Sequence, residues 1–219
     1  QALILFQGTY NSSNDIEIPN GKDMVVKFDG AGSGATVEQV DKNLNPTTVA
    51  VTGAIAVTGD YSSTTSGTSN LRLGVNAGNS ITSGGNYNVL IGDEAGTAIT
   101  TGDNNVAVGF EALKTEDAHG QNVAVGYQAL KTLDAGANGQ NTAVGYQAGA
   151  AMTTGIISTF VGSFAGDAQT SGSRNVGIGY SALSGNTLGK RNVAVGGGAL
   201  ELFNLSTDTN GYNTAVGHE

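Results

Sequence analysis

The sequence predicts an all-β chain in which a small N-terminal β-module is followed by a stacked-coil parallel β-solenoid, or β-roll. The main observation is a short motif that recurs nine times between residue 70 and the end of the chain, most often every 17 residues. Each copy is rich in Val, Ile and Thr, which favour strands. The period is a second observation, because 17 residues is too short for a repeat that contains helices.

The motif begins with Asn, continues with a hydrophobic residue or Thr, a variable residue and an aliphatic residue, and ends with Gly. We number its positions from that Asn. The first position is occupied by Asn70, Asn88, Asn105, Asn122, Asn141, Asn175, Asn192 and Asn213, with Ser158 in the sixth copy. The fifth is occupied by Gly74, Gly92, Gly109, Gly126, Gly145, Gly162, Gly179, Gly196 and Gly217. We assign these residues a structural role, because Gly permits tight corners and stacked Asn amides bond to one another and to the backbone.

The first positions are separated by 18, 17, 17, 19, 17, 17, 17 and 21 residues. The extra residues of the longer steps lie only between motifs, in segments such as 134–140 and 203–212. Insertions at one place in a repeat become loops on one face of a stack. We therefore expect a β-roll of nine coils over residues 70–219, of which the last is incomplete.

The side chains of each strand should alternate between the interior and the surface. We expect the aliphatic fourth position, for example Val108 and Val125, to form the inner stripe. The eighth position is Ala in every complete copy, as in Ala112 and Ala129. So small a residue indicates a close approach, either inside a thin coil or against another chain.

Side chains this small bury little area in each coil, whereas ordering the backbone costs about 1–2 kcal/mol per residue. A second source of burial is therefore expected, and three chains packed around one axis, an intertwined homotrimer, would provide it. The aromatic residues that follow the motif Gly are expected at that interface or on the outer surface. They are Phe110, Tyr127, Tyr146 and Tyr180.

Residues 1–60 differ from the repeats and predict a β-rich module, a small β-sandwich or β-prism, that ends in a connector strand. Strands are expected at residues 2–6, 24–28 and 36–40, with a shorter one at 16–19 and the connector at 47–58. Turn signals occur at Asn20-Gly21 and Asp29-Gly30. Residues 61–69 are rich in Ser, Thr and Gly and predict a linker. The sequence lacks an initial Met and ends inside a repeat, so we expect a piece of a longer chain.

Composition excludes several classes of partner. The formal net charge is −9, and the nine Lys and Arg residues are scattered, so we expect no nucleic-acid partner. No segment approaches the ~20 continuous apolar residues of a membrane helix, so we expect no membrane insertion. The absence of Cys removes disulfides and zinc–thiolate sites.

No catalytic, cofactor-binding or metal-binding residue is expected, and neither is enzymatic activity. His119 and His218 lie in segments typical of linkers, where a lone His is usually solvated. A glycosidase would need a pair of carboxylates. The candidates are expected instead to be solubilising charges on outer corners, and they are Asp93, Glu94, Glu111, Glu116 and Asp117. Calcium coils would place an Asp in every turn, whereas Asp is irregular here.

The Asn-Val-Ala-Val-Gly and Asn-Thr-Ala-Val-Gly units, at residues 105–109, 122–126 and 141–145, resemble the head repeats of trimeric autotransporter adhesins. Similar repeats occur in phage tail fibres. The resemblance covers residues 70–219 and implies short parallel β-roll coils assembled as trimers, left-handed in that family. The period here is longer than the usual family repeat, so handedness and cross-section do not carry over.

Residues 47–58 are similar to segments that precede the shafts of phage tail fibres, which favours a virion fibre. The resemblance thus implies a structural tail-fibre segment that mediates host-cell attachment. Its expected partners are further copies of itself, other tail components and a host-surface receptor, glycan or protein. The alternative is the head of a bacterial trimeric surface adhesin. Less favoured are an ice-binding solenoid, which requires a flat Thr-x-Thr array, and a β-helical glycan depolymerase, which requires a carboxylate pair in a groove.

Overall fold

The computed structural model describes residues 67–205 and 207–218, together with the backbone of four short strands before residue 41. The chain divides into two units, residues 1–56 and 57–219, which are described separately.

The four short strands of the first unit form two antiparallel pairs. Strand β1 (Leu3–Leu5) pairs with β2 (Ile16–Ile18), and β3 (Val25–Lys27) pairs with β4 (Glu38–Val40). All four lie within the segments for which strands are predicted. The predicted connector strand at 47–58, the two turns and most of the predicted linker lie outside the described residues.

The second unit is a parallel β-solenoid of nine coils, as the repeat predicts. Each motif contributes one strand of three residues, from its second to its fourth position. The strands are β5 (Leu71–Leu73), β6 (Val89–Ile91), β7 (Val106–Val108), β8 (Val123–Val125), β9 (Thr142–Val144), β10 (Thr159–Val161), β11 (Val176–Ile178), β12 (Val193–Val195) and β13 (Thr214–Val216).

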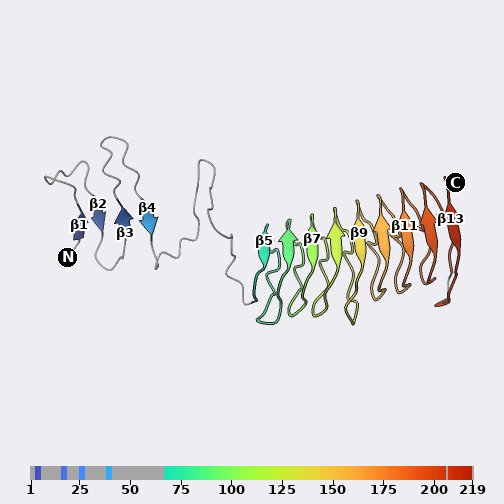
Figure 1. Ribbon diagram of the computed structural model, residues 1–219, viewed down its shortest axis with the longest axis horizontal. Helices are drawn as coiled ribbons and strands as arrows, with labels where there is room; N and C mark the ends of the chain where they lie inside the picture. Colours follow the sequence, from blue (N-terminus) through green and yellow to red (C-terminus); the bar gives the residue numbers. More distant parts are fainter. Residues whose placement is uncertain are drawn as a thin grey trace. The chain divides into compact units, whose positions relative to one another are not determined.

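These nine strands form one parallel sheet in sequence order, with the connecting segments looping behind it (Figure 1). Equivalent motif positions pair between neighbours, so that Ala107 lies opposite Ala124 and Val108 opposite Val125. The described residues contain no helix. We call the segment from one first position to the next a coil; coil 3 is then 105–121, coil 4 is 122–140, coil 6 is 158–174 and coil 7 is 175–191.

The interior is lined by the third motif position rather than the fourth. In coils 2 to 8 this residue is buried, and in coils 3, 4, 5 and 8 it is Ala. The second and fourth positions face outward and stay half-buried or exposed, as with Val106 and Val108 of β7. The predicted inner stripe of fourth-position aliphatic residues is therefore wrong. Because side chains alternate along a strand, the second and fourth positions share one face and the third position faces the interior.

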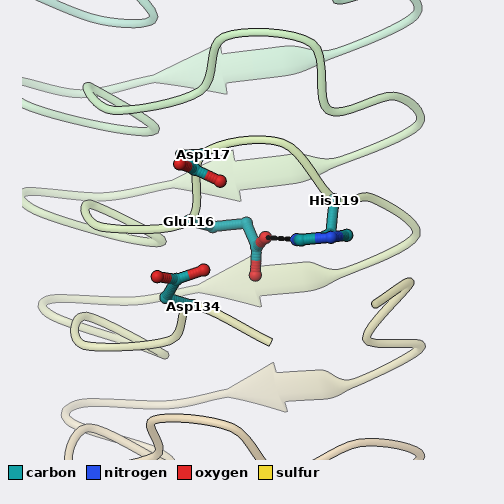
Figure 2. A group of neighbouring side chains, drawn as sticks. All are labelled: Glu116, Asp117, His119 and Asp134. Atoms are coloured by element: carbon teal, nitrogen blue, oxygen red, sulfur yellow. Dashed lines mark ion pairs between the residues drawn. The ribbon is translucent and has the colours of Figure 1, made fainter. Parts of the chain in front are cut away.

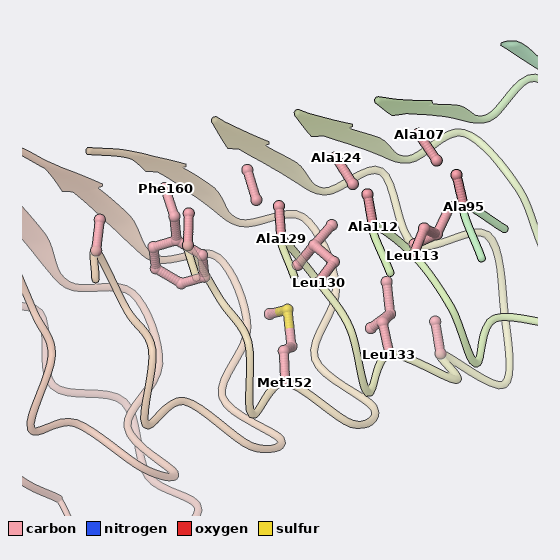
Figure 3. Close-up of a cluster of buried hydrophobic side chains, with 14 of the residues drawn as sticks. Ala95, Ala107, Ala112, Leu113, Ala124, Ala129, Leu130, Leu133, Met152 and Phe160 are labelled. Atoms are coloured by element: carbon pink, nitrogen blue, oxygen red, sulfur yellow. The ribbon is translucent and has the colours of Figure 1, made fainter. Parts of the chain in front are cut away.

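The rest of the core comes from the connecting segments. The eighth-position Ala is buried in all eight complete coils, which confirms close approach inside a thin coil. Beside it lie larger side chains, including Leu113, Leu130 and Leu133, with Met152 and Phe160 further along the axis (Figure 3). Phe160 replaces the usual small third-position residue, and the neighbouring coil has Gly177 at that position. An added Cβ on Gly177 would lie 3.2 Å from the Phe160 ring.

The predicted Asn ladder runs along the stack. The backbone N–H of each first-position residue donates to the side-chain oxygen of the preceding one, at 2.9 Å from Asn88 to Asn70 and 2.9 Å from Asn105 to Asn88. The hydroxyl of Ser158 continues the ladder by accepting the N–H of Asn175 at 3.2 Å. The amide nitrogen of Asn88 also closes its own coil by donating to the carbonyl of Gly102 at 2.8 Å. A buried, fully used amide thus explains why the first position is almost always Asn.

The fifth-position Gly is required by both conformation and space. Gly109 has a φ of 131°, and a Cβ added there would lie 2.4 Å from the carbonyl oxygen of Gly126 in the next coil. Any larger residue would clash with backbone that has no freedom to move away.

Candidate functional site

The outer face of the nine-stranded sheet presents a continuous apolar stripe, which we call the valine stripe. It consists of the second- and fourth-position side chains of β5 to β13, mostly Val with some Thr, Ile and Leu. Val144 is 37% exposed and Ile178 is 39% exposed. Because the strands repeat at ~4.8 Å, the stripe offers one pair of branched side chains at each step along the axis.

A second surface feature is a ladder of aromatic rings beside the sheet. Ring centroids are 5.5 Å apart between Phe110 and Tyr127 and 5.0 Å apart between Tyr127 and Tyr146, both stacked. Phe164, which is one position later in its coil, joins edge-on at 5.2 Å from Tyr146, and Tyr180 follows at 6.1 Å. The first three rings thus stack face to face, and the last two contacts are edge to face. In the single chain Phe110, Tyr127, Tyr146 and Tyr180 are exposed.

The acidic candidates differ in exposure, and two of them lie on the surface as expected of solubilising charge. Asp93 and Asp117 are exposed, and Glu111 lies between Lys114 and Lys131, with N–O distances of 2.7 Å to each. Hydrogen bonds from Lys114, Lys131 and Gln128 lower the pKa of Glu111 to about 2. This carboxylate is therefore fully neutralised by its neighbours and is poorly suited to act as a catalytic acid.

Glu116 departs from that expectation, because its side chain is fully buried inside coil 3. Its Oε2 accepts a hydrogen bond from the backbone N–H of Ala135 at 3.2 Å. Its Oε1 lies 3.4 Å from Nδ1 of His119, and neither of these two atoms has a hydrogen-bond partner. Burial raises the pKa of Glu116, opposed by the Ala135 hydrogen bond and by His119. The prediction of an outer-corner charge is wrong for this residue.

Two further carboxylates lie beside Glu116. Asp117 of coil 3 and Asp134 of coil 4 occupy the same repeat position in neighbouring coils, and both are exposed. One ligand atom from each of Glu116, Asp117, His119 and Asp134 lies within 4.8 Å of every other (Figure 2). The second histidine, His218, is exposed, in keeping with a solvated linker residue.

Aligning the coils reveals the cluster, whereas considering each acidic residue alone does not. The twelfth position is Ile99, Leu133 and Met152 in three other coils, so an inward-facing side chain is expected at Glu116. The fifteenth position is Gly in the other four 17-residue coils, whereas coil 3 has His119. Departures from the repeat at two positions of one coil, one inward-facing and the other a buried Gly in other coils, are the signal for this site.

Comparison with protein families, with curated proteins and with solved structures finds no match to this chain. In the part of the chain that the structure describes, no helix is long and apolar enough to cross a membrane.

Proposed function

We propose that this chain is a non-catalytic structural segment of a phage tail fibre that assembles as a homotrimer and mediates host-cell attachment. The observation that carries the proposal is the valine stripe. Branched apolar side chains repeat on the outer face of nine successive strands, and Val89, Val106 and Val123 are only half-buried in the single chain. Burying such a row against a partner gains about 25 cal/mol per Å² of apolar area.

The regularity of the valine stripe favours copies of the same chain as partners. A surface that matches it along its whole length must present apolar groups at the same axial spacing. A second and third copy do so by construction, and closed symmetry places equivalent coils at equal heights. A stiff trimeric rod with bonded coils suits mechanical reach, in keeping with the resemblance of the motif units to fibre and adhesin-head repeats.

Attachment is proposed to involve other tail components and a host-surface receptor, with the virion as the location. The loops that lengthen single coils, 134–140 and 203–212, are the segments where sequence varies most freely without disturbing the stack. The head of a bacterial trimeric surface adhesin is the alternative, since the same valine stripe and motif units support it equally. A membrane-anchor domain in the same gene would favour that alternative over the virion.

The first test is the molar mass of the 219-residue chain in solution, by light scattering after gel filtration. We expect about three times the chain mass of 21.9 kDa. Val125→Asp, on the valine stripe, should yield monomers, whereas the matched change Ala137→Asp in the exposed loop should not. A monomeric wild-type chain, or a Val125→Asp variant that stays trimeric, would overturn the proposed assembly.

Host attachment has its own test. Fluorescently labelled trimer is mixed with bacteria, and the cell-bound fraction is measured with and without excess unlabelled trimer. Saturable, competed binding is expected. A trimer that binds no bacterium of a broad panel would leave the fibre architecture in place and overturn its role in attachment.

A further inference from the structure

Coil 3 and the neighbouring part of coil 4 differ from the other coils at positions whose side chains lie close together. Position 12 faces the interior and is Ile99 in the coil before and Leu133 in the coil after, yet it is Glu116 here. Position 13 is Thr in coils 1, 2, 5, 6 and 7 and Asp only in coils 3 and 4, at Asp117 and Asp134. His119 replaces the usual Gly. Four residues that differ from the repeat therefore lie close together in the stack.

The convergence leaves a buried carboxylate incompletely satisfied. A carboxylate accepts hydrogen bonds but cannot donate them, and burying one without a counter-charge is costly. Oε1 of Glu116 faces Nδ1 of His119 at 3.4 Å without a hydrogen bond on either atom. Among the described residues, no ion pair of Lys or Arg involves Glu116, Asp117 or Asp134, and the imidazole of His119 is the one basic side chain that lies against them.

We propose that Glu116, Asp117, His119 and Asp134 bind a divalent transition-metal cation of the Zn²⁺ class. Three carboxylate oxygens and one imidazole nitrogen form a donor set in which the imidazole favours Zn²⁺ and its first-row neighbours over Ca²⁺ and Mg²⁺. The ion would neutralise the excess negative charge and engage the two atoms that lack hydrogen-bond partners.

The geometry requires little change. Two ligands held at about 2.0–2.2 Å from one ion lie no more than about 4.4 Å apart. The potential ligand atoms are already within 4.8 Å of one another. In Figure 2 Glu116 lies between His119 on one side and the two aspartates on the other. Asp117 and Asp134 are exposed and free to rotate toward the buried Glu116.

The position of the ion suggests what it does. Asp134 begins the segment 134–140, where coil 4 carries its extra residues, and Ala135 already bonds to Glu116. A metal ion shared between Glu116 and Asp134 would clamp coil 3 to coil 4 at the base of this loop and fix its course. The site thus acts as a staple for an otherwise irregular coil, and it requires neither the trimer nor host attachment.

The test is isothermal titration of the complete chain with ZnCl₂ after treatment with a chelator and its removal. We expect about one Zn²⁺ per chain and a higher Tm in its presence, because a ligand that binds only the folded state stabilises it. CaCl₂ is titrated in parallel and should bind far more weakly. Absence of stoichiometric Zn²⁺ binding would overturn the proposal.

Variants separate this site from adventitious binding. His119→Gly restores the residue of the other coils, and Glu116→Leu restores an apolar interior, so both should fold. Each should weaken Zn²⁺ binding by about 100-fold or more, since losing even an outer partner of a ligand costs about 10–100-fold. His218→Ala, the matched control, should bind as the wild type does. Unchanged binding in His119→Gly, or loss in His218→Ala, would contradict the assignment.

Discussion

Two buried polar clusters occupy the same repeat position in different parts of the solenoid, and they are satisfied in different ways. In coils 6 and 7 position 12 is Gln169 and Asn186, both buried. Oε1 of Gln169 accepts hydrogen bonds from the amide nitrogens of Asn175 and Asn186, each at 3.0 Å. Its own amide nitrogen donates to the carbonyl of Thr187 at 2.9 Å. That network closes upon itself.

Glu116 in coil 3 has no such closure. Its Oε2 accepts a hydrogen bond from the backbone of Ala135, and its Oε1 lies 3.4 Å from Nδ1 of His119 without a hydrogen-bond partner on either atom. The difference is one of chemistry, since an amide both donates and accepts whereas a carboxylate only accepts. The solenoid interior therefore tolerates a polar side chain where amides can pair, and a carboxylate there calls for a cation.

The largest loss of stability is expected when the hydrogen-bond network around Gln169 is broken. Gln169→Ala creates a cavity and removes one of the two acceptors of the buried amide nitrogens of Asn175 and Asn186, which keep only the carbonyl of Gly189. Each unsatisfied buried group costs about 1–3 kcal/mol, so we expect a loss of about 2–4 kcal/mol in the free energy of unfolding. Urea denaturation measures it, with Thr154→Ala on the exposed surface as the control. A loss no greater than that of the control would show that the network contributes nothing.

At the cluster around Glu116 we expect a substitution to raise the free energy of unfolding rather than to lower it. Glu116→Leu removes the incompletely paired carboxylate and restores the residue type of Leu133 and Ile99. Replacing a buried ion pair by apolar residues of similar volume is often neutral or stabilising by about 1–4 kcal/mol. The same sign is expected for Glu116 alone, because its Oε1 and Nδ1 of His119 form no hydrogen bond and the His119 side chain that remains is partly exposed. In the presence of a chelator we expect a gain of about 1–2 kcal/mol, measured by urea denaturation. A clear loss would mean that the pair of Glu116 and His119 is better satisfied than its distances indicate.

Much of the solenoid follows from the repeat, because equal motifs at equal spacing must stack in register. The strand positions, the Asn ladder and the buried eighth-position Ala were all predictable on that ground. Which face of the sheet lies inside was not predictable, because alternation defines two faces without identifying the buried one. The greater hydrophobicity of Val favoured the wrong face. What decides is the space that the rest of the coil leaves, since Ala107 shares its coil with the buried Leu113, whereas the large Phe160 packs against Gly166.

The cluster around Glu116 was predictable only in part. Each acidic residue, taken by itself, is typical of a solvated corner. The twelfth position is apolar in most of the aligned coils, and this pattern would have predicted a buried side chain at Glu116. Asp134 lies close to Glu116 because coil 4 stacks on coil 3. The separation of these two residues in the sequence does not reveal this contact.

The smallest change in stability is expected when Glu111, whose carboxylate is paired with two lysines, is replaced. The two lysines and Gln128 lower the pKa of Glu111 to about 2. A lowered folded-state pKa means that Glu111 contributes stability above its ordinary pKa of 4.5, which is lost as the pH falls toward about 2. Glu111 is largely covered but its two lysines are 32% and 34% exposed, and ion pairs near the surface contribute about 0–1 kcal/mol. We therefore expect Glu111→Gln to lower the free energy of unfolding by a few tenths of a kcal/mol at pH 7. The difference from wild type should shrink between pH 4.5 and pH 2, as followed by thermal unfolding across that range. A difference that grew on acidification would contradict the sign, and would mean that Glu111, like Glu116, is short of donors rather than fully paired.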